Sequence, residues 1–191
     1  MKYFIQVTLT TYIAAMLVYS LWGWVTFQTL DRGWIGSLVY LPHGCRVIFY
    51  CFFGVRALPA LYLAEITGPT LVWGEQYLDW WYIASISSLL SVVIAVEIIK
   101  WSKVSSWKPS ILLKINFSNY KFLIFVIIIS ALFNAIFTNL VLSIINGVDL
   151  TVQVAARFFI GDVFGSACFI AFLMVMFNML RSNRLYEVND N

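Results

Sequence analysis

The stretch that decides the fold is residues 122–145, which read FLIFVIIISALFNAIFTNLVLSII and contain no Asp, Glu, Lys or Arg. The hydrocarbon core of a bilayer is about 30 Å thick, and a helix that rises about 1.5 Å per residue needs about 20 apolar residues to cross it. The stretch meets both the length and the polarity requirement. We therefore predict that it forms a transmembrane helix.

The whole chain has a matching composition. Of its 191 residues, 62% are hydrophobic and 11% are charged, and the mean hydropathy is +0.88. A soluble domain carries about 45–50% apolar and about 25% charged residues. This composition excludes a soluble enzyme, a nucleic-acid-binding protein and a disulfide-stapled secreted module. The length fits one compact domain.

Turns and charged segments divide the chain into further apolar stretches. We predict about six spans, at residues 4–30, 34–53, 57–73, 80–99, 122–145 and 154–180. The first stretch follows Lys2 but is too long for a signal peptide and lacks a small-residue cleavage site. The expected fold is an all-α polytopic transmembrane helix bundle over residues 1–180, followed by a short polar cytoplasmic tail over residues 181–191.

Basic residues predict the orientation of the spans, because basic loops stay on the cytoplasmic side. With six spans, nine Lys and Arg residues fall on one face: Lys2, Arg56, Lys100, Lys103, Lys108, Lys114, Lys121, Arg181 and Arg184. The other face carries Arg32 and the acids Asp31, Glu75, Asp79 and Asp149. We therefore expect both termini to be cytoplasmic, in a multi-pass protein of the bacterial inner membrane. The net charge of +3 predicts no nucleic-acid partner, since five of the twelve basic residues lie in one loop.

Ionisable residues inside the spans are the candidate functional site, since each costs about 2.5–3.5 kcal/mol at the bilayer centre and normally faces a partner. Four such residues fall in the outer half of the membrane: Arg46, Glu65, Arg157 and Asp162. His43, Asn134 and Asn139 reach similar depths. Arg46 could pair with either Asp162 or Glu65. Three interpretations stay open: paired charges that only fix helix register, a cluster that binds a small ligand, and a site that handles protons or ions.

Helix-breaking residues lie next to these charges. Pro42 and Gly44 flank His43 and predict a kink or unwound turn beside Arg46. Such backbone is tolerated at depth only where it is buried in protein or lines a cavity. Pro59 has the same effect near the start of the third span.

The last predicted span contains a second packing signal. Gly161 and Gly165 form a G-x-x-x-G motif, which predicts the close approach of a neighbouring backbone. The motif is common in membrane helices and is a weak sign of function. Its notable feature is Asp162, which lies between the two glycines.

Catalytic patterns are poor. A single histidine and the absence of Cys/His ligand spacing argue against structural zinc and bis-histidine haem; no metal or catalytic residue is predicted, and the cofactor question is left open. Cys45, Cys51 and Cys168 all lie in apolar stretches, which indicates packing. An intramembrane thiol nucleophile is disfavoured because buried thiols in apolar surroundings are inert. We predict that the protein is not an enzyme.

Two motifs resemble the MASE1 family of bacterial integral membrane sensor domains. The first is Leu41-Pro42-x-Gly44 followed by Phe53-Gly54-x-Arg56-x-x-Pro59-x-x-Tyr62-Leu63, and the second is Arg157-x-x-x-Gly161-Asp162-x-x-Gly165. The similarity covers most of residues 33–180. It implies a multi-helix sensory module of the kind that precedes a histidine kinase, diguanylate cyclase or phosphodiesterase domain.

The sequence departs from that family in three ways. It has fewer spans than the family's roughly eight, His43 and Cys45 replace small apolar residues, and we expect no output domain to follow. A lone module would act through another membrane protein or a homo-oligomer, with the polar cluster as ligand or switch site. The alternatives are the substrate-binding subunit of a small-solute transporter and an architectural subunit of a membrane complex.

Overall fold

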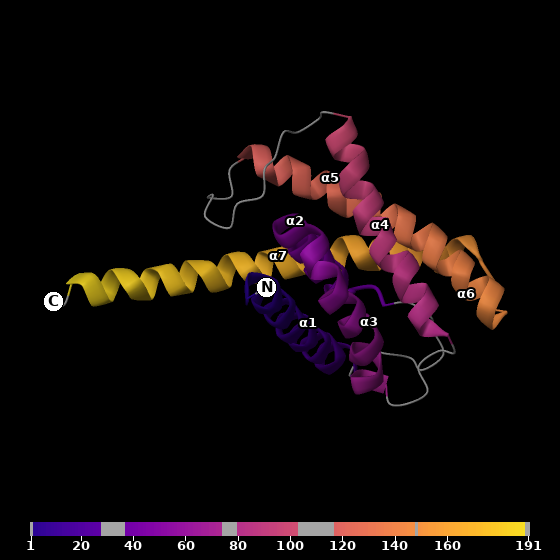
Figure 1. The fold of residues 1–191 in the computed structure, drawn as a ribbon, viewed down its shortest axis with the longest axis horizontal. Helices are drawn as coiled ribbons and strands as arrows, with labels where there is room; N and C mark the ends of the chain where they lie inside the picture. Colours follow the sequence, from indigo (N-terminus) through magenta and orange to yellow (C-terminus); the bar gives the residue numbers. More distant parts are fainter. Residues whose placement is uncertain (1, 28–36, 74–79, 103–116, 148, 190–191) are drawn as a thin grey trace.

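The computed structural model of the chain describes residues 2–27, 37–73, 80–102, 117–147 and 149–189. These residues form a helical bundle (Figure 1) whose elements are α1 (Lys2–Phe27), α2 (Leu41–Phe53), the 3₁₀ turn η1 (Gly54–Ala57), α3 (Leu58–Trp73), α4 (Trp81–Trp101), α5 (Phe117–Phe133), the π-helical turn η2 (Asn134–Thr138), α6 (Asn139–Asn146) and α7 (Val152–Asn189). Residues 28–36, 74–79 and 103–116, which carry several of the charges used to predict orientation, lie outside the described residues.

Five helical stretches of the described chain are long and apolar enough to cross a membrane: Lys2–Thr26, Leu41–Val72, Trp81–Trp101, Lys121–Asn146 and Val152–Met179. The predicted all-α transmembrane class is confirmed at this level. The count by length and composition is one fewer than the six predicted spans. The difference arises because the predicted second and third spans join into the single stretch Leu41–Val72.

The chain reverses direction inside that stretch. Arg46 and Glu65 are nineteen positions apart, which would separate them by about 28 Å in a straight helix, yet Arg46 Nε lies 3.1 Å from Glu65 Oε1. The reversal occurs in η1, where Gly54 adopts φ +61°, a backbone conformation that other residues rarely adopt. The motif Phe53-Gly54-x-Arg56-x-x-Pro59 therefore forms the turn of a helical hairpin whose two arms are α2 and α3. Pro59 is the second residue of α3, where its missing N–H costs no helical hydrogen bond.

Contacts with α1 fix the direction of both arms of the hairpin. At its tip, the Arg56 guanidinium lies 5.3 Å from the centre of the Tyr3 ring. At the far end, Trp22 Nε1 donates a 2.8 Å hydrogen bond to the carbonyl of Val39, just before α2. Tyr3 and Trp22 are about 28 Å apart along α1. The chain from Val39 to Arg56 thus runs antiparallel to α1 over most of its length. Helix α3 then runs parallel to α1.

The second span begins later than predicted. Ser37–Tyr40 are not helical, and α2 starts at Leu41 with Pro42 in its first turn, where a proline is tolerated. The prediction of a kink inside this span is therefore wrong, because Pro42 and Gly44 lie in the first turn of α2 and the helix has no earlier part. Six consecutive residues, Pro42–Val47, are buried. They place α2 in the centre of the bundle, where one core cluster joins it to α1 and α3 and another joins it to α4 and α5.

The G-x-x-x-G motif of α7 accommodates the chain that leads into α2. A Cβ on Gly161 would overlap the carbonyl oxygen of Ser37, and one on Gly165 would overlap the backbone of Tyr40. Tyr40 N–H donates a 2.9 Å hydrogen bond to the carbonyl of Gly161. A neighbouring backbone does approach both glycines closely, and it belongs to the non-helical segment Ser37–Tyr40 instead of a helix.

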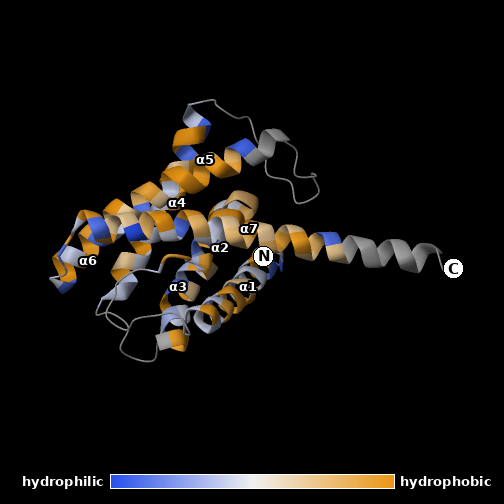
Figure 2. Ribbon diagram, turned by 180° about the vertical axis from the view of Figure 1, so that it is seen from behind, coloured by the Kyte–Doolittle hydropathy of each residue, from blue (hydrophilic) through white to orange (hydrophobic). Residues whose placement is uncertain are grey.

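The outer surfaces of the helices are apolar. Figure 2 shows hydrophobic colouring over much of the coloured parts of α5 and α7. Large side chains such as Leu17, Trp24, Ile144 and Phe177 are exposed. An apolar exterior around a buried polar centre is the arrangement that a lipid solvent requires. The backbone of α7 continues through most of the predicted tail, as far as Asn189.

Replacing Gly161 by alanine should destabilise the bundle by about 1–3 kcal/mol, because the added methyl group forces α7 away from Ser37. The measurement is thermal unfolding of the purified protein in detergent micelles. Ala171→Leu, which adds volume at an exposed position of the same helix, is the control and should leave the melting temperature almost unchanged. Alanine favours helices over glycine by about 1 kcal/mol, so a higher melting temperature for Gly161→Ala would contradict the packing.

Candidate functional site

Four helices bring polar side chains into the centre of the bundle. His43 and Arg46 lie one turn apart on α2 and face different partners. His43 faces α5 and α7, and Arg46 faces α3. We call the buried set His43, Arg46, Glu65, Ser130, Asn134, Thr138 and Asp162 the polar core.

His43 connects the α5 side to the α7 side of the polar core. Its Nδ1 lies 3.5 Å from Asp162 Oδ2, and its Nε2 lies 3.0 Å from Ser130 Oγ. The Ser130 hydroxyl also lies 3.2 Å from the carbonyl of Ile127. Two proton arrangements fit these distances. With Nδ1 protonated, Ser130 donates to Nε2, and Nδ1 faces Asp162 without making a hydrogen bond in the described structure. With Nε2 protonated, His43 donates to Ser130 and Ser130 donates to Ile127.

Asn134 supports the Asp162 carboxylate. The Asn134 Nδ2 group donates a 2.6 Å hydrogen bond to Asp162 Oδ2, and its Oδ1 accepts a 2.7 Å hydrogen bond from Thr138 Oγ1. Asn134 begins the π-helical turn η2, a backbone form that often occurs at functional sites. Asp162 also lies beside the first turn of α2, where the helix dipole favours a negative charge.

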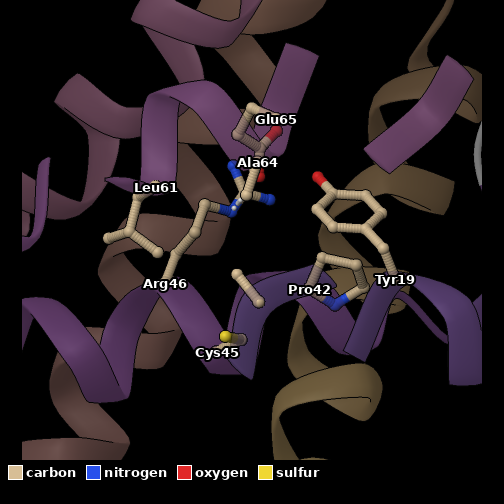
Figure 3. Close-up of a pocket in the computed structure, with 8 residues that line it drawn as sticks. Tyr19, Pro42, Cys45, Arg46, Leu61, Ala64 and Glu65 are labelled. Atoms are coloured by element: carbon tan, nitrogen blue, oxygen red, sulfur yellow. Dashed lines mark ion pairs between the residues drawn. The ribbon is translucent and has the colours of Figure 1, made fainter. Parts of the chain in front are cut away.

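Arg46 and Glu65 form the second part of the polar core. Both side chains are 2% exposed, and Figure 3 shows them meeting, with the Tyr19 hydroxyl turned toward them. The Arg46 guanidinium lies 5.3 Å from the centre of the Tyr40 ring. On the other side of Glu65, Trp81 Nε1 donates a 2.8 Å hydrogen bond to the Glu65 carbonyl.

The hydrogen bonding of this pair is incomplete. Within the described chain, all three guanidinium nitrogens of Arg46 and Glu65 Oε2 are buried without a hydrogen-bond partner, although Arg46 Nε lies 3.1 Å from Glu65 Oε1. A buried donor or acceptor without a partner costs about 1–3 kcal/mol, and more for a charged group. The space beside the pair is bordered by Tyr19, Pro42 and Cys45 and is too narrow to hold a water molecule. The Asp162 carboxylate thus accepts a hydrogen bond from Asn134, whereas the Arg46 guanidinium donates none within the described chain.

The structure also places the potential metal ligands and the three cysteines. Among the residues that the structure describes, no group of three His, Cys, Asp or Glu side chains could hold a metal ion. Cys45 and Cys51 are buried as predicted, and Cys45 borders the space beside Arg46. Cys168 is exposed on α7, contrary to the expectation of a buried set, because it lies on an outer face of that helix.

The structure brings together five of the six predicted cluster residues. His43, Asn134 and Asp162 form one group, and Arg46 pairs with Glu65, one of its two predicted partners. Arg157 is half-buried on α7 and takes part in neither ion pair of the polar core. Asn139 donates to the Ala135 carbonyl of its own helix instead.

Sequence reasoning missed Ser130, Thr138 and the tyrosines around Arg46. A signal for the first two was present. Ser130, Asn134 and Thr138 recur at intervals of four in an otherwise apolar run, and this spacing places them on one helix face. Tyr19 and Tyr40 join through a 2.9 Å hydrogen bond between their hydroxyls. They come from separate segments, and no spacing in the sequence links them.

Searches of known protein families, of curated proteins and of solved structures find no match for this chain. The functional argument therefore rests on the polar core itself.

Replacing Arg46 alone by methionine should destabilise the protein by about 3–5 kcal/mol, because Glu65 then stays buried without its counter-charge. The double variant Arg46→Met/Glu65→Met should regain most of that loss, since neither charge remains. Thermal or denaturant unfolding of the two single variants and the double variant measures the coupling. Glu97→Gln/Lys100→Gln removes an exposed ion pair of 2.7 Å and should change stability by less than about 1 kcal/mol. Additive effects of the Arg46 and Glu65 changes would contradict the pairing.

Proposed function

We propose that this chain is a non-catalytic sensory or regulatory module of the bacterial inner membrane, that it resembles the MASE1 family, and that it acts through another membrane protein. The polar core is its switch, and a partner reads the packing of α2 against the surrounding helices. The observation that carries the proposal is that α2 presents His43 and Arg46 to different helices, each with its own buried carboxylate.

The polar core has the features of a two-state element. The His43–Ser130–Ile127 chain accommodates two proton arrangements, and four buried polar atoms of the Arg46–Glu65 pair have no hydrogen-bond partner in the described structure. A change that satisfies these atoms, or moves the proton on His43, alters the relative energy of two packings of α2. A ligand or partner shifts such an equilibrium only by binding the two states differently.

The motifs that carry the resemblance coincide with the parts that build this core. Leu41-Pro42-x-Gly44 starts α2, Phe53-Gly54-x-Arg56-x-x-Pro59 turns the hairpin, and Gly161-Asp162-x-x-Gly165 receives the Ser37–Tyr40 segment and supplies Asp162. This coincidence supports a shared architecture. The transporter alternative draws support from the interior start of α2, because broken helices line substrate sites in transporters.

In the proposed topology the hairpin contributes two passes, the chain crosses six times and both termini are cytoplasmic. Val55, which is exposed at the hairpin tip, should then react with a membrane-impermeant thiol reagent from the same side as position 102, and position 149 should react from the opposite side. The measurement is labelling of Val55→Cys, Ser102→Cys and Asp149→Cys in a Cys168→Ser background, in intact cells and inverted vesicles. Five straight spans would leave position 55 in the bilayer, so an unreactive Val55→Cys in folded protein would contradict the hairpin topology.

The switch proposal predicts that Asp162→Asn changes partner association at least tenfold while the protein stays folded, because the amide removes the charge that faces His43 and Asn134. The measurement is the stoichiometry of membrane partners retained after cross-linking and mild purification from native membranes. Glu97→Gln is the matched control, since it neutralises an exposed acid, and it should behave as wild type.

Two results would overturn the switch proposal. One is unchanged association of a stoichiometric partner with folded Asp162→Asn. The other is accumulation of labelled glycine, L-alanine or L-serine by proteoliposomes that contain this chain alone, which would favour the transporter alternative.

A further inference from the structure

The space between α1, α2 and α3 holds two opposite charges that are each only partly used. Arg46 Nε lies 3.1 Å from Glu65 Oε1 as an ion pair, and Arg46 Nη1 and Nη2 and Glu65 Oε2 are, like Nε, buried without hydrogen-bond partners in the described structure. Both side chains border the same small space, together with Tyr19 and Cys45 (Figure 3). Two parallel N–H donors on a guanidinium match the two oxygens of a carboxylate, and a free carboxylate oxygen matches an ammonium group.

Charge balance narrows the class of ligand. Taken by itself, the Arg46–Glu65 pair is neutral, while the Asp162 carboxylate of the polar core faces His43 and Asn134. A simple anion would add a negative charge beside Glu65, and a simple cation would add a positive charge beside Arg46. Either would leave a net charge in a region of low dielectric constant, which is strongly unfavourable. A molecule that carries one charge of each sign adds no net charge and complements both groups.

We infer that the Arg46–Glu65 site binds a compact zwitterion of the α-amino-acid class, with its carboxylate on Arg46 Nη1 and Nη2 and its ammonium group on Glu65 Oε2. This inference rests on the proposed function, because it names the ligand that shifts the polar core between two states. Cys45 and the aliphatic side chains of Leu61 and Ala64 border the site, which in this packing holds not even a water molecule, so only a compact ligand fits once Tyr19 has moved aside.

The site in this structure is closed. The Tyr19 ring packs against Gly68 so tightly that a Cβ there would overlap it, and the Tyr19 hydroxyl bonds to that of Tyr40. The ligand therefore enters only when the Tyr19 side chain moves. That movement breaks the Tyr19–Tyr40 link between α1 and the segment that leads into α2, and so couples ligand binding to the packing of the central helix.

The test is direct binding to the full chain in lipid nanodiscs. The probes are radiolabelled glycine, L-alanine and L-serine, measured by scintillation proximity. At least one probe should bind saturably and be displaced by the same unlabelled amino acid. Acetate and methylamine, which carry only one of the two charges, should not displace it at equal concentration.

Two variants locate the binding. Arg46→Lys keeps the positive charge but loses the forked donors, and it should weaken binding at least tenfold. Arg46→Met/Glu65→Met removes both charges together and should abolish binding, with thermal unfolding as the check that it is folded. The control variant Glu97→Gln/Lys100→Gln should bind as wild type does.

The inference is overturned if none of the three probes binds saturably to folded wild-type protein. It is also overturned if acetate or methylamine displaces the probe equally well, or if the double methionine variant still binds it. These failures are separable from failure of the proposed function. A partner that depends on Asp162 while no amino acid binds would leave the switch in place and remove only its ligand.

Discussion

The pairing of Arg46 with Glu65 is the constraint on which the rest of the bundle depends. A guanidinium in the middle of an apolar helix must meet a carboxylate or leave the membrane. Its partner is nineteen positions away, so the chain has to reverse between them, and the reversal in turn requires Gly54 with its positive φ. The hairpin, the central place of α2 and the parallel course of α1 and α3 all follow from this one contact.

The interior start of α2 raises a second problem, which α7 solves. Non-helical backbone that packs against other helices must have its buried polar groups satisfied by hydrogen bonds. The Tyr40 N–H bonds to the Gly161 carbonyl and the Val39 carbonyl accepts from Trp22, while the lack of side chains at Gly161 and Gly165 allows the approach. Because Asp162 lies between these glycines, the contact that gives the Tyr40 N–H its hydrogen bond also places the Asp162 carboxylate beside His43.

Composition and hydropathy are sufficient to predict the all-α membrane class. The depth of the polar residues within the predicted spans is sufficient to identify most of the polar core. Depth could not choose the partner of Arg46, since Asp162 and Glu65 lie in the same band. Nor could it reveal that Arg157 takes part in neither pair. That choice depends on which helix faces are turned inward, and packing between distant segments decides it. The G-x-x-x-G motif predicts a close contact at Gly161 but not the segment that makes it. The sequence predicts a helix at Ser37–Tyr40, because these residues are largely apolar.

The two halves of the polar core differ in a way that bears on function. Around Asp162, Asn134 bonds to Asp162 and His43 bonds to Ser130, so this half holds α2, α5, η2 and α7 together, and His43 Nδ1 is its one histidine nitrogen without a hydrogen-bond partner. Around Arg46, the charges are neutralised but the hydrogen bonds are not completed. A contact selected only for stability would gain from apolar replacements at both positions. Retaining a charged pair with unsatisfied nitrogens is more easily understood if another state of the protein, or a bound molecule, satisfies them, and this asymmetry is why the Arg46 half is the better candidate for the input of a switch.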